Sequence, residues 1–161
     1  MHEEIIDELV LVRKAEEKDA EAIVAFNVAM ALETEGKVLD PSIVSAGVMG
    51  LLLNSAAGFY VVVEMGGSVS ACLMITTEWS DWRNNTFWWI QSVYVHEDFR
   101  RRGLYRSLYN FVRDLAQQDG GVCGFRLYVE RNNQKAQDTY LSLGMHETHY
   151  KIFEEKIFEE C

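Results

Sequence analysis

The sequence has few cysteines, and those it has form no recognisable pattern. Cys72, Cys123 and Cys161 are an odd number, and no two of them stand in a C-x-x-C spacing. Such a set builds neither a disulfide framework nor a zinc site. We therefore expect reduced thiols in a cytoplasmic protein and no bound metal, with Cys72 and Cys123 inside strands and Cys161 at the terminus.

Long hydrophobic runs are also missing. The longest apolar stretch, near residues 48–53, is interrupted by Gly50 and is far shorter than the roughly 20 residues that cross a bilayer. The first residues, Met1–Glu4, are acidic where a secretory signal is basic. These features predict a protein with neither a membrane segment nor a signal peptide.

Positive charge is scarce, with 15 lysines and arginines against 25 acidic residues and a net charge of -10. This balance argues against nucleic acid and anionic membranes as partners and favours cationic ones, although acidity also serves solubility. A hydrophobic content of 48% over 161 residues excludes disorder. We expect one domain, residues 1–161, that buries a sizeable core.

A strand, a basic turn and a helix follow one another in the middle of the chain. Residues 88–95 are aromatic and β-branched, as in a strand that is buried on both faces. Apolar residues then recur at helical spacing from Leu104 to Gln117. The first amides of such a helix lack intrahelical acceptors, and Arg100, Arg101 and Arg102 lie beside them. The turn is therefore a candidate phosphate site, with a solvated basic surface as the alternative.

The remaining elements are predicted from periodicity and turn residues. We expect further strands at 9–15, 59–65, 68–79, 124–130 and 147–155, and further helices at about 20–33, 41–54 and 132–143. A Gly66-Gly67 turn joins two of the strands into a hairpin, Asp19 and Asp40 cap the first two helices, and Gly144 ends the last one. The predicted fold class is α/β with a mixed sheet, in which an antiparallel meander continues into a parallel pair and helices cover both faces.

Two groups of side chains have more than one explanation. Trp79, Trp82, Trp88 and Trp89 cluster around the connection at 80–85. They fit core packing, a dimer surface or an acceptor pocket. The glutamates at 33 and 35 fit either a substrate-facing loop or an ordinary exposed helix end.

The basic turn has the form of a known motif. Arg100-x-x-Gly103 directly after a buried strand resembles the R-x-x-G-x-G/A pyrophosphate loop of the GNAT-type N-acetyltransferase superfamily, which binds acetyl-coenzyme A (acetyl-CoA) there. Tyr105 stands where the motif ends in a small residue. Because the loop binds through backbone amides, the motif tolerates a large side chain that points away.

A second motif follows at the distance usual for the same family. Asn133, Ala136, Tyr140 and Gly144 are spaced by three, four and four residues, which resembles the N-x-x-A-x-x-x-Y-x-x-x-G segment of these enzymes. Taken singly, Asn133 reads as a helix cap and Tyr140 as half-buried packing. The resemblance extends over about residues 10–155.

This resemblance implies a GNAT fold, acetyl-CoA as cofactor, and a set of binding residues. Residues 88–95 and 125–130 form a parallel pair that splays apart, backbone groups of Val93 and Val95 pair with the pantetheine arm, and amides of 101–106 hold the pyrophosphate. The implied cofactor-binding residues are Val93, Tyr94, Val95, Arg100, Arg101, Arg102, Gly103, Leu104, Tyr105, Arg106, Asn133 and Tyr140.

The implied reaction is acetyl transfer to a primary amine, either a small cationic amine or a lysine side chain. It requires stabilisation of an oxyanion and a proton for the departing thiolate. The amide of Val93 and the phenol of Tyr140, whose ordinary pKa is about 10, suit these roles. The residue that acts as general base on the amine is not identified, because Gln91 occupies the position where many members of the resembled family have glutamate. Glu78 or Asp81 acting through water, or solvent alone, are the alternatives.

Two other functions fit the same residues. Gln91 and Tyr105 also suit an acetyl-CoA-binding module with little or no turnover. The tryptophans also suit a structural or dimerisation protein without a cofactor. For the enzyme we expect an amine as partner, no nucleic acid, no membrane, and a homodimer.

Overall fold

The computed structural model describes residues 9–159, which group into two compact units that divide between Leu127 and Tyr128. The expectations about Met1–Glu4 and Cys161 fall outside the described residues. The first unit contains the sheet and three of the helices, and the second contains the last helix and the C-terminal segment.

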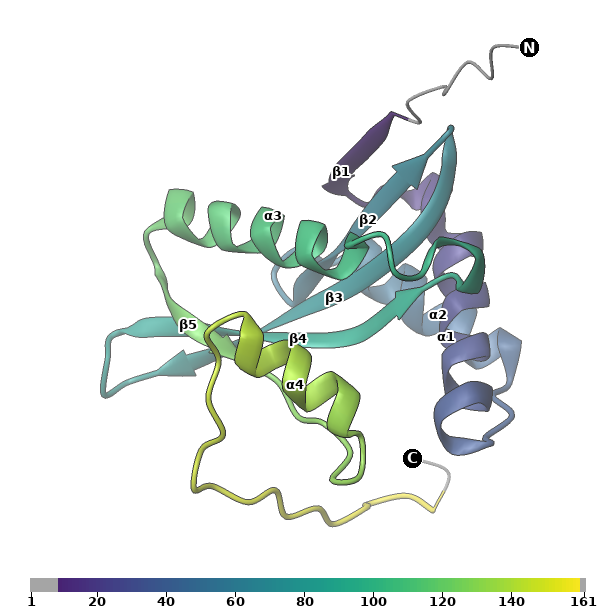
Figure 1. Ribbon diagram of the computed structural model, residues 1–161. Coiled ribbons are helices and arrows are strands. Elements are labelled where there is room, and N and C mark those ends of the chain that lie inside the picture. Colours follow the sequence, from purple (N-terminus) through teal and green to yellow (C-terminus); the bar gives the residue numbers. More distant parts are fainter. Residues whose placement is uncertain (1–8, 160–161) are drawn as a thin grey trace, which may run out of the picture. The chain divides into compact units, whose positions relative to one another are not determined.

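The sheet has five strands in sequence order (Figure 1). Their bounds are β1 Val10–Lys14, β2 Gly58–Met65, β3 Ser68–Ser80, β4 Asn85–Val95 and β5 Val122–Arg126. The pairs from β1 to β4 are antiparallel, and β4 pairs with β5 in parallel. The predicted mixed sheet is confirmed. So is the hairpin, because Gly66 and Gly67 both adopt left-handed backbone angles that glycine accepts without strain.

Helices cover both faces of this sheet (Figure 1). Their bounds are α1 Ala20–Glu35, α2 Pro41–Leu52, α3 Leu104–Asp119 and, in the second unit, α4 Gln134–Ser142. Ile23 of α1 and Val48 of α2 join one core cluster with Val62 and Cys72 of the sheet. Alternate β2 residues, such as Val61, point to the opposite face, where α3 contacts all five strands. Its buried residues are Leu104, Leu108, Tyr109, Val112 and Ala116.

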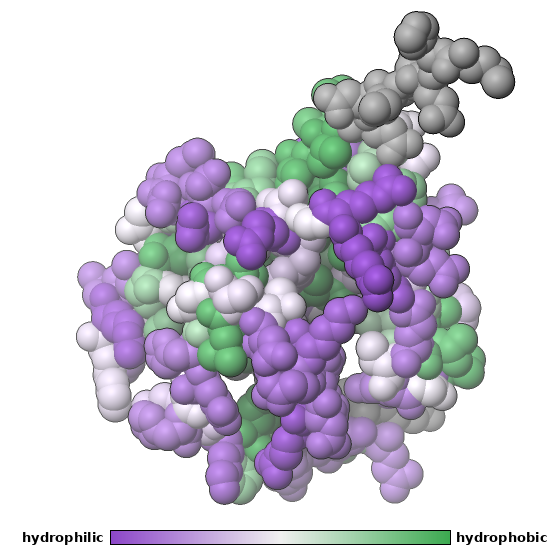
Figure 2. Space-filling model, in the orientation of Figure 1, coloured by the Kyte–Doolittle hydropathy of each residue, from purple (hydrophilic) through white to green (hydrophobic). Residues whose placement is uncertain are grey.

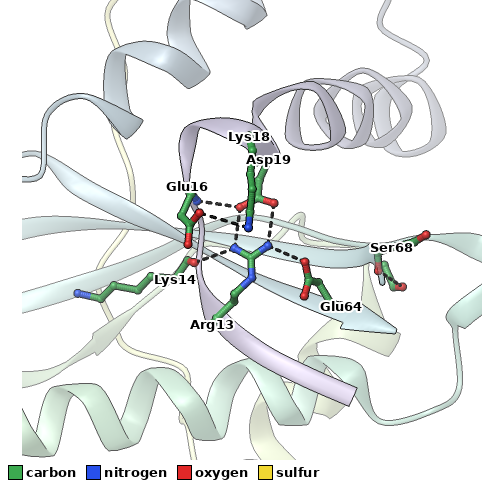
Figure 3. Close-up of polar contacts among 8 residues, drawn as sticks. Arg13, Lys14, Glu16, Lys18, Asp19, Glu64 and Ser68 are labelled. Atoms are coloured by element: carbon green, nitrogen blue, oxygen red, sulfur yellow. Dashed lines mark hydrogen bonds and ion pairs between the residues drawn. The ribbon is translucent and has the colours of Figure 1, made fainter. Parts of the chain in front are cut away.

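A buried ion pair fixes the start of α1 (Figure 3). Asp19 occupies the predicted cap position, but its carboxylate does not bond the helix amides. It accepts two hydrogen bonds from Arg13 of β1, at 2.7 and 2.9 Å, and one from the Glu16 amide at 2.8 Å. Arg13 also donates to Glu64 of β2 at 2.7 Å. The helix is thus anchored to two strands through one guanidinium.

The other two predicted helix signals are confirmed. The Asp40 carboxylate accepts from the Ser42 amide at 2.8 Å, with Pro41 at the first position of α2. At the end of α4, Gly144 adopts a left-handed φ of 93°, and the following amide of Met145 donates to the carbonyl of Tyr140 at 3.1 Å.

Two strand predictions are wrong. β5 ends at Arg126 and not at Glu130, and residues 147–155 form no strand in the described part of the chain. The apolar side chains in that segment are exposed, with 69% for Tyr150, 66% for Ile152 and 91% for Phe153. β-branched and aromatic residues favour a strand only when a neighbouring strand supplies hydrogen bonds and a surface to pack on. The sequence of the segment cannot show whether that neighbour exists.

The tryptophans differ in burial, and Trp89 is half-buried. Trp88 is 7% exposed and packs edge-on against Phe59, with ring centroids 5.2 Å apart. Trp79 and Trp82 are 64% and 87% exposed at the end of the β3–β4 hairpin. Core packing therefore explains Trp88 and does not explain Trp79 or Trp82.

The two described cysteines lie in strands as free thiols, as predicted. Cys72 in β3 is buried, and burial raises the pKa of its thiol to about 12. It is therefore an inert core residue. Cys123 in β5 is exposed.

The viewed surface is mostly hydrophilic. Figure 2 shows that hydrophilic side chains cover most of the viewed face, with scattered apolar patches between them. Within residues 9–159, none of the helices combines the length and the apolar character that crossing a bilayer requires.

Candidate active site

A β-bulge interrupts β4. Cys72 faces Tyr94 and Met74 faces Gln91, so two residues of β4, Ser92 and Val93, stand opposite one residue of β3. Ser92 has a φ of 49°, which a residue with a side chain rarely adopts. Bulges of this kind redirect the backbone and are frequent near active sites.

After the bulge, β4 has a free edge. Its pairing with β5 ends at Trp89 and Arg126, and residues 9–159 contain no further strand on that side. The His96 amide donates back to Ser70 of β3 at 2.9 Å. Because backbone groups alternate along a strand, those of Val95 face the open edge. The splay that the sequence predicted is confirmed on the β4 side.

The open edge leads into the basic turn. The turn contains η2 (Glu97–Phe99), and Arg101 and Gly103 adopt left-handed φ angles of 65° and 74°. Gly103 is the N-cap of α3 and provides no side-chain cap, and the first intrahelical bond runs from the Ser107 amide to its carbonyl at 3.1 Å. The amides of residues 104–106 therefore point out of the helix end, where the dipole favours an anion.

The side chains of this turn differ in what they contact. Arg100 donates through Nε to the Val95 carbonyl at 2.9 Å and through Nη2 to Glu33 at 2.8 Å. The Arg102 guanidinium lies 5.3 Å from the Phe99 ring centre. The remaining two arginines of the turn, at 101 and 106, are exposed.

Tyr105 does not point into the helix end. Its ring stacks on Tyr109 one turn further along α3, with centroids 6.5 Å apart. A large side chain at this motif position is therefore compatible with open backbone amides at the N-terminus of the helix.

Asn133 and Tyr140 lie on α4, in the second unit. The Oδ1 atom of Asn133 caps the helix by accepting from the Ala136 amide at 3.1 Å. The cap uses Oδ1 and not the Nδ2 donors. Tyr140 stands two turns further on, and burial raises the pKa of its phenol above the ordinary value. It therefore keeps its proton at neutral pH.

The two candidate bases lie at the far end of β3. Glu78 accepts a hydrogen bond from Arg126 of β5, whose guanidinium also lies 3.8 Å from the Phe87 ring centre. Asp81 is exposed and accepts from the Trp82 amide at 2.9 Å. Gln91, in place of the family's glutamate, donates to the Thr76 hydroxyl at 2.9 Å.

The site residues predicted from the sequence thus fall into separate places. Val93 and Val95 lie in β4, and the basic turn leads from the end of that strand to α3. Glu78 pairs with Phe87, six residues before Val93, which is on the order of 20 Å along a strand. Neither Glu78 nor Asp81 therefore reaches a group bound at Val93 directly.

Glu33 is the residue whose partners the sequence did not indicate. Its two carboxylate oxygens accept from Tyr94 at 2.9 Å and from Arg100 at 2.8 Å. These hydrogen bonds, and Arg100 above all, lower the pKa of Glu33. The partners are 61 and 67 residues away in the chain, and no local pattern encodes such a contact.

Comparison with known proteins places this geometry in a family. The Acetyltransferase (GNAT) family matches residues 34–145. The crystal structure of a possible acetyltransferase from Clostridium difficile 630 is 43% identical, covers 94% of this chain and 100% of its own, and superposes with a TM-score of 0.88. No curated protein matches the chain.

More distant structures share the fold. The aminoglycoside N-acetyltransferase AAC(6')-Iy in complex with CoA is 15% identical, with a TM-score of 0.74 over 94% of this chain and 97% of its own. The ribosomal-protein-alanine N-acetyltransferase from Brucella melitensis is 13% identical, with a TM-score of 0.75 over 93% of this chain and 100% of its own. Because the family match spans most of the chain and the Clostridium structure is similar over nearly all of it, this protein belongs to the GNAT family and is an acetyl-CoA-dependent N-acetyltransferase.

Proposed function

We propose that this enzyme transfers the acetyl group of acetyl-CoA to the primary amine of a small cationic molecule or of a lysine side chain. The observation that carries the proposal is the open edge of β4, which runs from the bulge at Ser92 to the bare N-terminus of α3. An edge with alternating donors and acceptors suits an arm that contains amides, and a helix N-terminus suits a pyrophosphate.

The backbone supplies most of the proposed binding site. Val93, Tyr94 and Val95 present the strand, and residues 101–106 present the amides and three exposed arginines. Because the Val95 carbonyl already accepts from Arg100, this residue offers its N–H to the ligand. Asn133 offers the Nδ2 donors that its capping bond leaves unused.

In the proposed reaction, the amine nitrogen bonds to the acetyl carbon as the carbon–sulfur bond breaks. The Val93 amide donates to the carbonyl oxygen while it carries negative charge. Tyr140 gives its phenolic proton to the departing sulfur, and the raised pKa of Tyr140 ensures that the proton is present at neutral pH. The proton lost by the amine passes to water, and the Tyr140 phenolate takes a proton back from water.

A dedicated base is not required in this scheme. Glu78 and Asp81 lie at the other end of β4, and Glu78 is already paired with Arg126. Either carboxylate would act only through a chain of waters. We therefore assign deprotonation of the amine to solvent and expect the enzyme to be most active where a substantial fraction of the amine is neutral.

The acceptor class follows from charge. A chain with a net charge of -10 attracts a cationic amine more readily than an acidic one. We also propose that residues 1–161 act as one acetyltransferase domain in the cytoplasm and that the exposed Trp79 and Trp82 contribute to a homodimer. Sedimentation of the protein and of a Trp82→Ala variant tests the dimer.

The experiment for the reaction compares Tyr140→Phe with Tyr150→Phe, a matched change at an exposed tyrosine of the same unit. Release of CoA from acetyl-CoA is followed with a panel of primary amines. We expect Tyr140→Phe to lower kcat by about 100-fold or more, as loss of a general acid does, with CoA affinity nearly unchanged. Tyr150→Phe should behave like the natural protein.

Two results would count against the proposal. Equal activity of Tyr140→Phe and the natural protein would remove Tyr140 from the mechanism. Tight CoA binding without transfer to any amine would favour the alternative function, an acetyl-CoA-binding module with little or no turnover.

A further inference from the structure

The carboxylate of Glu33 connects three elements beside the proposed cofactor surface, which consists of the open edge of β4 and the N-terminus of α3. Glu33 belongs to the last turn of α1, Tyr94 to the end of β4, and Arg100 to the turn before α3. Tyr94 is 7% exposed and its ring lies 5.2 Å from that of Phe26, so its hydroxyl is held in a fixed position against α1. The Arg100 guanidinium lies 5.4 Å from the centre of the Tyr94 ring.

Glu33 lies where a helix does not favour a carboxylate. The C-terminal turn of a helix carries partial negative charge, and the last turn of α1 contains no basic residue to offset it. The compensation comes from outside the helix, through the guanidinium of Arg100 and the hydroxyl of Tyr94. The hydrogen bonds from Arg100 and Tyr94 stabilise the ionised carboxylate and lower the pKa of Glu33.

Arg100 connects Glu33 to the cofactor surface. Its Nε atom holds the carbonyl of Val95, the last residue of β4, while its Nη2 atom holds Glu33. The following residues lead directly to the left-handed Gly103 and the start of α3. The distance between the open strand edge and the helix end therefore depends on where Arg100 is fixed.

We propose that Glu33 is a positioning residue for the cofactor, which acts through Arg100 to hold the β4 edge and the α3 N-terminus at the separation that a CoA molecule spans. The proposal rests on the cofactor surface proposed above. Glu33 itself does not touch the ligand. Glu33 and Arg100 are 41% and 44% exposed, and exposed ion pairs contribute little to folding stability, so the contact can be removed from a folded protein.

The test compares Glu33→Gln with Glu35→Gln, which makes the same change of charge two residues along at the same helix end. Binding of CoA is measured by calorimetry, and binding of ADP by competition against CoA. ADP has the pyrophosphate without the pantetheine arm, so it uses the helix end and not the strand edge. A ligand that joins two subsites loses affinity when their separation changes, whereas a ligand of one subsite does not.

We expect Glu33→Gln to weaken the binding of CoA by about tenfold. This loss is part of the gain in affinity that linking two subsites provides. ADP affinity should stay within about twofold in the same variant, and Glu35→Gln should leave both ligands unchanged. Arg100→Lys keeps the positive charge but cannot hold Glu33 and the Val95 carbonyl in one planar fork, so it should reproduce the selective loss of CoA.

Other results overturn the proposal. If Glu33 acts only by repelling the anionic ligand, Glu33→Gln binds both CoA and ADP more tightly. Equal weakening of CoA and ADP would indicate a general disturbance of the turn. If the natural protein itself fails to bind CoA, the cofactor surface is wrong and the role of Glu33 falls with it, which separates the two failures.

Discussion

The two ends of α1 are attached to the sheet by the same chemistry in different surroundings. At the N-terminal end, Arg13 holds Asp19 in a two-pronged pair and also bonds Glu64 (Figure 3). At the C-terminal end, Arg100 holds Glu33. The first pair is largely buried, with side-chain exposures of 17% and 4%, and the second is open, with 44% and 41%.

Burial and the helix dipole assign different roles to these pairs. Asp19 lies at the helix end that favours negative charge, and it is desolvated, so removal of its partner leaves an uncompensated buried charge. Glu33 lies at the end that disfavours negative charge, and water replaces its partner readily. A pair of an arginine and a carboxylate therefore supports the fold at one end of α1 and, in our proposal, adjusts a binding surface at the other.

The largest effect is expected from Arg13→Met. This change leaves Asp19 buried without its guanidinium, which costs about 3–5 kcal/mol for a broken buried pair. Urea unfolding measures the loss. Lys18→Met provides the control, because the ion pair of Lys18 with Glu16 is exposed and its loss should change stability by less than about 1 kcal/mol. Similar losses in the two variants would contradict the distinction by burial.

Acid should weaken the same buried pair, Arg13–Asp19, and lower the free energy of unfolding by less than Arg13→Met does. Burial alone raises the pKa of Asp19, but the hydrogen bonds from Arg13 and the Glu16 amide outweigh it and hold that pKa below its ordinary value. The resulting stability is present above the unfolded pKa of about 3.9 and is lost as pH falls through the lower folded pKa.

The measurement is the free energy of unfolding against pH for the natural protein and for Asp19→Asn. The difference between them should be constant near neutral pH and should shrink below about pH 4. A difference that persists unchanged in acid would show that the charge of Asp19 is not what stabilises the start of α1.

The smallest effect on stability is expected at the open pair. Glu33→Gln loses an exposed ion pair but also removes an unfavourable charge from the C-terminal turn, and each contribution is at most about 1 kcal/mol. The net change in the free energy of unfolding should be close to zero and close to that of Glu35→Gln. A loss as large as that of Arg13→Met would mean that the open pair also supports the fold, and the comparison would fail.

Prediction from sequence succeeded where a few consecutive residues carry the physical cause. Gly66 and Gly67 accept left-handed angles that the hairpin needs, Asp40 and Pro41 begin α2, and Gly144 ends α4. The turn that contains Gly103, between a buried strand and an amphipathic helix, was recognisable for the same reason. Each of these features depends on backbone angles and hydrogen bonds within one turn of chain.

Prediction failed where a partner from elsewhere decides the outcome. Residues 147–155 have a composition suited to a strand, yet nothing in the described chain pairs with them as one. Asp19 was expected to bond its own helix, but its carboxylate accepts from Arg13 of β1 and from the Glu16 amide instead. The position of Glu78 beside Phe87 and Arg126 was likewise set by the register of β3 on β4, and its role as a base acting through water stays a prediction.

The sequence by itself determined the order of the elements, the glycine turns and the two motifs that mark the family, because periodicity, caps and turn angles are properties of neighbouring residues. The tertiary structure alone decided which strand edge stays open, which carboxylate meets which arginine and which tryptophans are buried. Glu33 and Arg100 are 67 residues apart in the chain, and the packing of α1 against the sheet brings them into contact. Contacts of that kind depend on strand register and helix placement, which the whole chain sets together.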